Sequence, residues 1–122
     1  MRVGTRTGVA LLALLAGCGA PDDVEGTCDR DPPLSYTNFG HGFLGRHCTG
    51  CHSSLLPEGQ RVGAPLGVDL DTLEGVQRWA ERIRVRTVST DGGMPPGGGP
   101  TEEERVMLSE WLECTTLLEE SG

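Results

Sequence analysis

Apolar residues recur at helical spacing in three stretches of the chain, and no stretch alternates convincingly as a strand would. In the first stretch they fall at steps of three and four residues, on one face of a helix that begins near Ser35 or Thr37. This face comprises Tyr36, Phe39, Gly40, Phe43, Leu44 and His47. Each glycine inside this helix weakens it by ~1 kcal/mol relative to alanine. A glycine on the buried face is therefore expected to let another backbone come close.

Two more helices follow. One begins at Asp71, with Glu74 completing a variant of the capping box, and the other begins at Thr101, with Glu104 in the same role. Their apolar stripes are Leu73, Val76, Ala80 and Ile83 in one, and Met107, Leu108, Trp111, Cys114, Thr115 and Leu118 in the other. Long loops separate the helices, which in a small domain implies a central group to wrap around. The pattern predicts an all-α domain of three to four helices over residues 35–122.

Arginines at four positions of the second helical stretch form a basic strip beside its apolar stripe. They are Arg78, Arg82, Arg84 and Arg86, and Glu74 stands four residues before the first of them. Charge runs of this kind are usually solvated, so we interpret the strip as a surface face, with a ligand-binding role as the alternative.

The N-terminus has the pattern of a secretory signal, residues 1–17. Two arginines precede a short apolar run from Val9 to Ala16, which is shorter than the ~20 residues that span a bilayer. Residues 15–18, "LAGC", resemble the lipobox of bacterial lipoproteins, which implies cleavage before Cys18 and lipidation of that cysteine. By the sorting rule of that family, Gly19 indicates the outer membrane. Residues 18–34 are acidic and proline-bearing, and we interpret them as a tether.

The net charge of the chain limits the kinds of partner that it is expected to bind. The 122-residue chain has a net charge of −8, and all of its positive side chains are arginine. Nucleic acid binding needs a basic surface, so we expect no nucleic acid partner, whereas a protein with a basic docking surface would be attracted. Only 4% of the residues are aromatic. A core this poor in large side chains is expected to need a cofactor, a crosslink or both.

The stretch "HCTGCH" carries the candidate chemistry. Cys48, Cys51 and His52 form a C-x-x-C-H motif, which is typical of covalent c-type haem attachment. Cysteines three apart lie on one side of a helical turn, where both sulfurs can reach one haem, and the adjacent histidine can ligate its iron. A zinc site using the same residues and a thioredoxin-like dithiol are the alternatives. An export signal favours haem, because c-type haem is attached outside the cytoplasm.

From about Tyr36 to Thr115 the chain resembles the class I cytochromes c. Gly40 stands eight residues before the first motif cysteine and Leu44 four before it, as in that family. The resemblance implies that the last helix crosses the first at Gly40 and places Trp111 against it. It also implies one covalent haem c, a small fold of helices and long loops around it, and a proline carbonyl that accepts the His52 N–H. Pro65 is the candidate, with Pro57 as the alternative.

The loop "DGGMPPGGGP", residues 91–100, holds a lone methionine before the last helix. Class I cytochromes place their sixth iron ligand at such a position, which implies that Met94 has this role. Prolines restrict the loop's backbone and glycines allow it to approach a cofactor closely. The alternative is a bare linker. His41 and His47 are the other candidate ligands, but both fall on the motif's side of the haem and are expected to be surface or packing residues.

Two of the five cysteines have no role in lipidation or haem attachment. Cys18 is assigned to lipid and the motif cysteines to haem, so Cys28 and Cys114 remain in an oxidising compartment, where a disulfide between them is predicted from counting alone.

The sequence thus predicts an exported, lipid-anchored, one-electron carrier on the periplasmic side of a membrane, not an enzyme, with His52 and Met94 as axial ligands and redox proteins as partners. A haem-based gas sensor with a labile sixth ligand and a zinc-stabilised interaction module are the alternatives.

Overall fold

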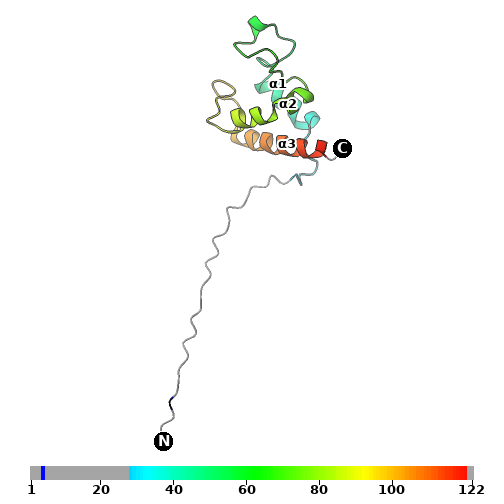
Figure 1. Cartoon of the computed structure of the whole chain (residues 1–122), viewed down its shortest axis with the longest axis vertical. Helices are drawn as coiled ribbons and strands as arrows, with labels where there is room; N and C mark the ends of the chain where they lie inside the picture. The colour runs from blue at the N-terminus through cyan, green and yellow to red at the C-terminus, as the bar shows by residue number, and fades with distance from the viewer. Residues whose placement is uncertain (1–3, 5–27, 121–122) are drawn as a thin grey trace.

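The computed structural model describes Gly4 and residues 28–120. The predicted signal segment, Cys18 and most of the tether lie outside the described residues, apart from Gly4. Within the described part the elements are η1 (Tyr36–Gly40), α1 (His41–His47), η2 (Glu58–Gln60), α2 (Leu73–Ile83), η3 (Arg84–Val88) and α3 (Glu102–Glu120), with no strand among them (Figure 1). The prediction of an all-α domain is therefore confirmed for these residues.

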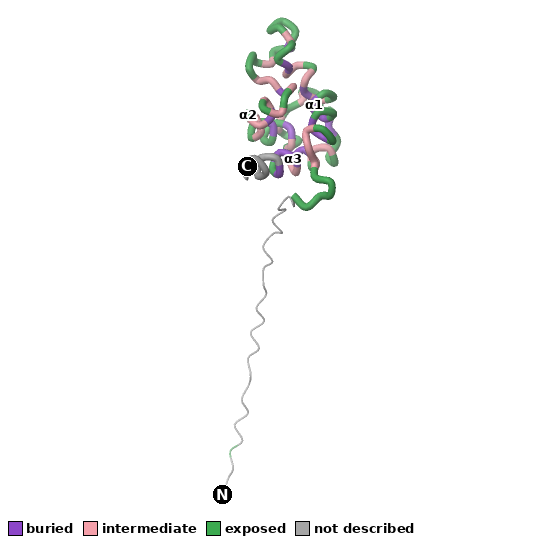
Figure 2. The backbone as a smooth tube through the Cα atoms, turned by 90° about the vertical axis from the view of Figure 1, so that its right-hand side faces the viewer, coloured by how far each residue is buried: buried purple, intermediate pink, exposed green. Residues whose placement is uncertain are grey.

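The first predicted helix is present as two joined segments. The π-helical turn η1 runs directly into α1, and Ser35 caps it by accepting a hydrogen bond from the Asn38 N–H while its own N–H donates to the Asn38 side chain. Phe39 in η1 and Phe43 and Leu44 in α1 are buried, and they belong to the same hydrophobic core as the buried residues of α3 (Figure 2).

The N-cap of α2 is Thr72, one residue after the predicted Asp71, so this prediction is wrong. Thr72 caps this helix by accepting from the Gly75 N–H. Asp71 instead accepts hydrogen bonds from Ser53 and Ser54, at 3.2 and 2.6 Å from their hydroxyl oxygens. A carboxylate used to close the loop that precedes the helix is not available as its cap, so the neighbouring threonine takes this role.

The capping box of α3 is confirmed. The Thr101 hydroxyl accepts from the Glu104 N–H at 3.1 Å, and the Glu104 carboxylate accepts from the Thr101 N–H at 2.9 Å. Each bond satisfies a backbone N–H that the first turn would otherwise leave unpaired.

A disulfide joins Cys28 to Cys114, so the pairing predicted from the cysteine count is present. Beside it, the Arg30 guanidinium makes two bonds to the Glu110 carboxylate, at 2.7 and 2.8 Å. The beginning of the described domain is thereby fastened to α3. The 53–72 loop, which connects α1 to α2, projects from the domain at the end away from α3 (Figures 1 and 2).

Candidate functional site

A cavity of about 580 Å³ lies where the end of α1, the 53–72 loop, the α2–η3 segment and the 91–100 loop meet. Its size falls within the range of small-molecule and cofactor pockets, about 300–1,000 Å³. The apolar and sulfur-bearing side chains that line it are those of Cys48, Cys51, Val62, Ala64, Pro65, Val68, Leu70, Trp79, Ile83, Met94, Pro95 and Pro96. The polar and charged residues of the lining are His47, His52, Arg61, Arg82, Arg86 and Thr87. The C-x-x-C-H residues and Met94, far apart in sequence, thus share one mostly apolar cavity.

The motif cysteines are presented by a turn that continues α1. The Cys48 and Thr49 N–H groups both donate to the Leu44 carbonyl, and those of Cys51 and His52 donate to the Cys48 carbonyl, at 3.1 and 2.9 Å. Neither Cys48 nor Cys51 takes part in a disulfide. The helical winding keeps both sulfurs on the cavity side.

Burial sets the chemistry of the Cys48 thiol. Desolvation raises its pKa to about 12, because a thiolate loses its hydration in this apolar surrounding. A redox-active dithiol works through a thiolate, and its pKa is usually lowered. Cys48 therefore has the opposite electrostatic setting from a dithiol nucleophile.

His52 is held from two sides. Its backbone carbonyl accepts from the Leu70 N–H at 2.8 Å, and its ring Nδ1 lies 3.0 Å from the Val68 carbonyl oxygen. A carbonyl oxygen only accepts, so Nδ1 carries the proton and the Nε2 lone pair is left available. This tautomer is the one that a metal-ligating histidine needs.

The prediction that the Pro65 carbonyl accepts the His52 N–H is wrong in this structure. That oxygen instead accepts from Arg61 Nη2 at 2.9 Å, and the carbonyl of Val68 faces His52. The reason lies in the turn at the end of the loop, where the Val68 N–H donates to the Pro65 carbonyl at 3.3 Å and carries the chain back toward the motif. The alternative Pro57 is the residue before η2, where its carbonyl accepts from the Gln60 N–H.

Met94 is positioned through its backbone. Its N–H donates to the Arg86 carbonyl at 3.0 Å, which ties the 91–100 loop to η3. A side chain at Gly92 would collide with the Arg86 backbone, so this close approach requires glycine there. The Met94 side chain lines the cavity and is 39% exposed. The loop is thus fastened at the point where it presents the thioether.

The other two histidines have packing contacts. His41 is exposed and meets Tyr36 edge to face at 5.7 Å between ring centroids. His47 packs against Phe43 at 4.9 Å, and its Nε2 lies 3.4 Å from the Glu104 carboxylate. His47 nevertheless lines the cavity, and a side chain at Gly99 in the 91–100 loop would lie within 3.1 Å of its Nδ1. This position brings it nearer to the Met94 loop than the sequence indicated.

Three arginines line the cavity. Arg82 and Arg86 are exposed, as the interpretation of their strip as a surface face predicts, whereas Arg61 is buried and was not predicted as a site residue. Arg82 and Arg86 alternate along the chain with Arg78 and Arg84, which pair with Glu74 at 3.3 Å and Glu81 at 2.7 Å, and this pairing is the sequence signal that separates the two sets. Arg61 offers no such signal, because a lone arginine in a loop is usually exposed.

Two kinds of feature are absent from the described residues. No three His, Cys, Asp or Glu side chains are grouped as a metal centre within residues 28–120. No helix in the same part is both long and apolar enough to cross a membrane. Comparison with known proteins is equally without result: no protein-family model matches the chain, and neither the curated proteins nor the solved structures contain a match.

Proposed function

We propose that this chain is a monohaem c-type cytochrome of class I that carries single electrons. The observation that carries the proposal is the single cavity that brings together Cys48, Cys51, His52 and Met94. Two thiols would bind the haem covalently, and an imidazole and a thioether would ligate its iron. When bound, haem supplies one-electron exchange between Fe(III) and Fe(II).

The residues present fit this group. The His52 ring has its Nδ1 proton directed at the Val68 carbonyl, which leaves Nε2 for the iron. The cavity is largely apolar, and its lining includes two exposed arginines, Arg82 and Arg86. Haem has an apolar body and two carboxylates, so this combination suits it. Gly40 against Trp111 further supports the class I resemblance, because a side chain at Gly40 would collide with the indole ring.

The chain's own residues account for the properties that a carrier needs. Val68 and Leu70 hold His52 from both ends, and the Arg86 carbonyl fixes the Met94 backbone. Ligands held in one geometry reduce the rearrangement that accompanies a change of oxidation state. These features favour a carrier over a sensor whose sixth ligand is easily displaced.

The zinc alternative has weaker support. A structural zinc site takes four ligands, usually cysteine and histidine, yet no three His, Cys, Asp or Glu side chains of the described residues are grouped so that they could hold a metal ion.

Covalent attachment tests the proposal. Protein produced in a host able to attach c-type haem should retain haem in its denatured intact mass and give the c-type pyridine haemochrome spectrum. Cys48→Ala with Cys51→Ala should abolish this retention, whereas Cys28→Ser with Cys114→Ser, the matched cysteine control, should keep it. A colourless protein, or haem that acidified organic solvent extracts, would refute the proposal. Ready binding of CO by the ferrous wild type would select the sensor instead.

The location is part of the proposal. We infer that Cys18 is lipidated and holds the protein on the periplasmic side of a membrane, with redox proteins as partners. Cys18→Ser should release a soluble form with the same haem spectrum. Equal membrane partitioning of wild type and variant would contradict the anchor while leaving the haem proposal intact.

A further inference from the structure

Arg61 is buried although it lies in an exposed loop. Its side chain is 1% exposed, whereas the next residue, Val62, is 85% exposed. Val62 also has a φ of 53°, in the left-handed region that a β-branched residue rarely adopts. A backbone held in this conformation indicates that the surrounding contacts, rather than local preference, determine the loop.

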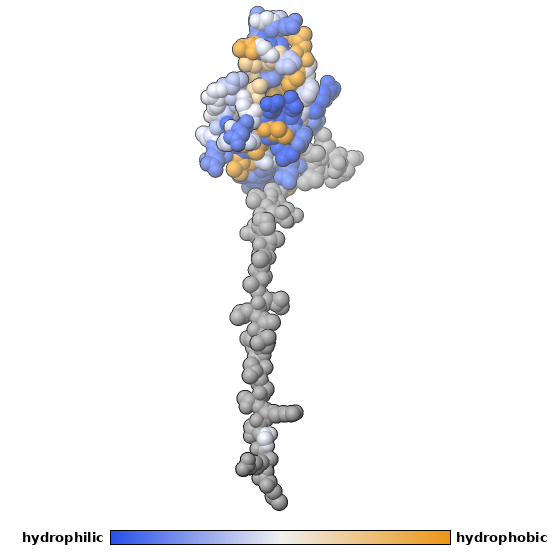
Figure 3. Space-filling model, turned by 60° about the vertical axis from the view of Figure 1, so that its left-hand side comes forward, coloured by the Kyte–Doolittle hydropathy of each residue, from blue (hydrophilic) through white to orange (hydrophobic). Residues whose placement is uncertain are grey.

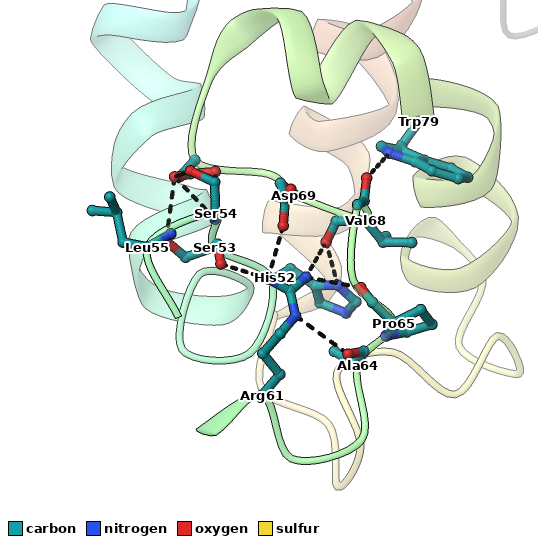
Figure 4. Close-up of polar contacts among 12 residues, drawn as sticks. His52, Ser53, Ser54, Leu55, Arg61, Ala64, Pro65, Val68, Asp69 and Trp79 are labelled. Carbon is teal, nitrogen blue, oxygen red and sulfur yellow. Dashed lines mark hydrogen bonds and ion pairs between the residues drawn. The ribbon is translucent and has the colours of Figure 1, made fainter. Parts of the chain in front are cut away.

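The Arg61 guanidinium supplies those contacts. It donates to four backbone carbonyls and forms an ion pair, all within the 53–72 loop (Figure 4). The carbonyls are those of Ser53 at 2.5 Å, Ala64 at 3.3 Å, Pro65 at 2.9 Å and Val68 at 3.0 Å. Asp69 Oδ1 lies 2.8 Å from Arg61 Nη1 and accepts no directed hydrogen bond, so this contact is electrostatic. A buried charge needs such partners, and here they are complete.

The Val68 carbonyl links Arg61 to the site, because it accepts hydrogen bonds from two side chains. Arg61 Nη2 and His52 Nδ1 each lie 3.0 Å from its oxygen (Figure 4). A carbonyl oxygen has two lone pairs, and both are thereby engaged. A charged donor makes the stronger bond of the two. The guanidinium therefore competes with the imidazole for the same acceptor.

We propose that Arg61 sets the electron-donating strength of His52 by sharing its acceptor, the Val68 carbonyl. This inference rests on the proposed haem function and adds a positioning residue to it. A hydrogen bond from Nδ1 raises the basicity of a metal-ligating histidine. Sharing the acceptor weakens that bond, so His52 becomes a weaker donor. A weaker donor stabilises Fe(III) less, and the buried positive charge acts in the same direction. Arg61 thus raises the reduction potential.

Asp69 opposes Arg61 in this arrangement. Its carboxylate attracts the guanidinium and thereby weakens the hydrogen bond that Arg61 donates to the Val68 oxygen. Removing Arg61 and removing the Asp69 charge should therefore shift the His52 hydrogen bond in opposite directions. This opposition separates the proposal from a general loss of loop structure, which would move both variants alike.

The experiment uses the haem-loaded protein and two measurements: the midpoint potential, and the ¹H resonance of His52 Nδ1–H in the ¹⁵N-labelled ferrous state. Arg61→Met should lower the potential and move the resonance downfield, as its bond strengthens. Arg78→Met is the matched control, since this exposed arginine pairs with Glu74 and lies outside the cavity lining, and it should leave the resonance in place. Asp69→Asn should move the resonance upfield and raise the potential. Asp91→Asn, an exposed charge on the 91–100 loop, should leave the resonance unchanged.

The outcomes separate the two proposals. Covalent haem with an unmoved His52 resonance in Arg61→Met, or a shift of the same sign in Asp69→Asn, would overturn the role of Arg61 and leave the cytochrome proposal standing. Absence of covalent haem from the wild type would overturn both. If Arg61→Met does not fold with haem, the Asp69→Asn measurement decides alone, because that variant keeps every Arg61 bond to a carbonyl.

Discussion

The indole of Trp111 lies so close to Gly40 that a methyl group at residue 40 would collide with its ring. Trp111 is fully buried, and Phe39 meets it edge to face at 5.9 Å between ring centroids. This contact is where α3 crosses the helical segment that leads into Cys48. The position of the motif relative to α3 therefore depends on one residue having no side chain.

Gly40→Ala should destabilise the domain. Overpacking of a tight core site typically lowers the free energy of unfolding by about 1–3 kcal/mol. Gly45→Ala is the control within α1, since nothing lies within 4 Å of a side chain there. That variant should gain about 0.5–1 kcal/mol, because alanine favours a helix over glycine. Denaturant titration of both checks this, and an equal response of the two would contradict a steric role for Gly40.

Glu104 should make stability depend on acid pH. Its pKa is lowered from 4.5 to about 2, first by the hydrogen bond from the Thr101 N–H and then by Arg46 and His47. A folded pKa below the unfolded value means that the stabilisation is complete above pH 4.5. It is lost as the pH falls from there toward 2.

Glu104→Gln isolates the charge, because glutamine can still accept from the Thr101 N–H. The variant should be less stable than wild type at pH 7, and the difference should shrink as the pH is lowered toward 2. Thermal unfolding across this range measures it. A difference that stays constant with pH would show that the ionised carboxylate is not responsible.

The helices could be predicted from the sequence because their apolar spacing and the Thr101–Glu104 pair are local signals. The crossing at Gly40 was also anticipated, but from the family resemblance and not from spacing. Local signals failed where a side chain serves a distant partner. Asp71 has the chemistry of a helix cap, yet its carboxylate bonds to Ser53 and Ser54 instead.

Local sequence signals also predict only part of the candidate site. Cys48, Cys51 and His52 lie within five consecutive residues, so their shared face follows from the turn that holds them. The acceptor for His52 depends on how a loop with many glycines and prolines folds back. Arg61 determines that path through contacts with Ser53, Pro65 and Val68. The family resemblance implies a proline carbonyl as the acceptor, and no spacing rule relates a buried arginine to the carbonyls of this loop. The Val68 acceptor could therefore not be predicted from the sequence.

Met94→Ala should leave the covalent haem intact but open the sixth position to CO. The wild-type ferric protein should show the near-infrared sulfur-to-iron charge-transfer band, and the variant should lose it. Met94→His should restore six-coordination and lower the potential, because methionine ligation raises it. Met107→Leu, which changes the methionine on α3, should keep the band. A band that survives in Met94→Ala would make residues 91–100 a linker.

Cys28→Ser with Cys114→Ser should reduce the free energy of unfolding. The bond closes a loop with a sequence separation of 86. The chain-entropy relation gives about 4–5 kcal/mol for a loop of this size. Covalent haem would already restrict the unfolded chain, so we expect about 2–4 kcal/mol. Chemical denaturation under non-reducing conditions measures this. Unchanged stability would mean that the crosslink does not constrain the unfolded chain.

The disulfide also determines the mechanical path through the domain. Tension applied to the chain ahead of Cys28 passes through the sulfur bridge and the Arg30–Glu110 pair into α3. Little of this force reaches the backbone between Leu34 and His52, because the bridge bypasses it. A domain held by its N-terminal end could then swing and strain at that end while the spacing between His52 and Met94 stays fixed.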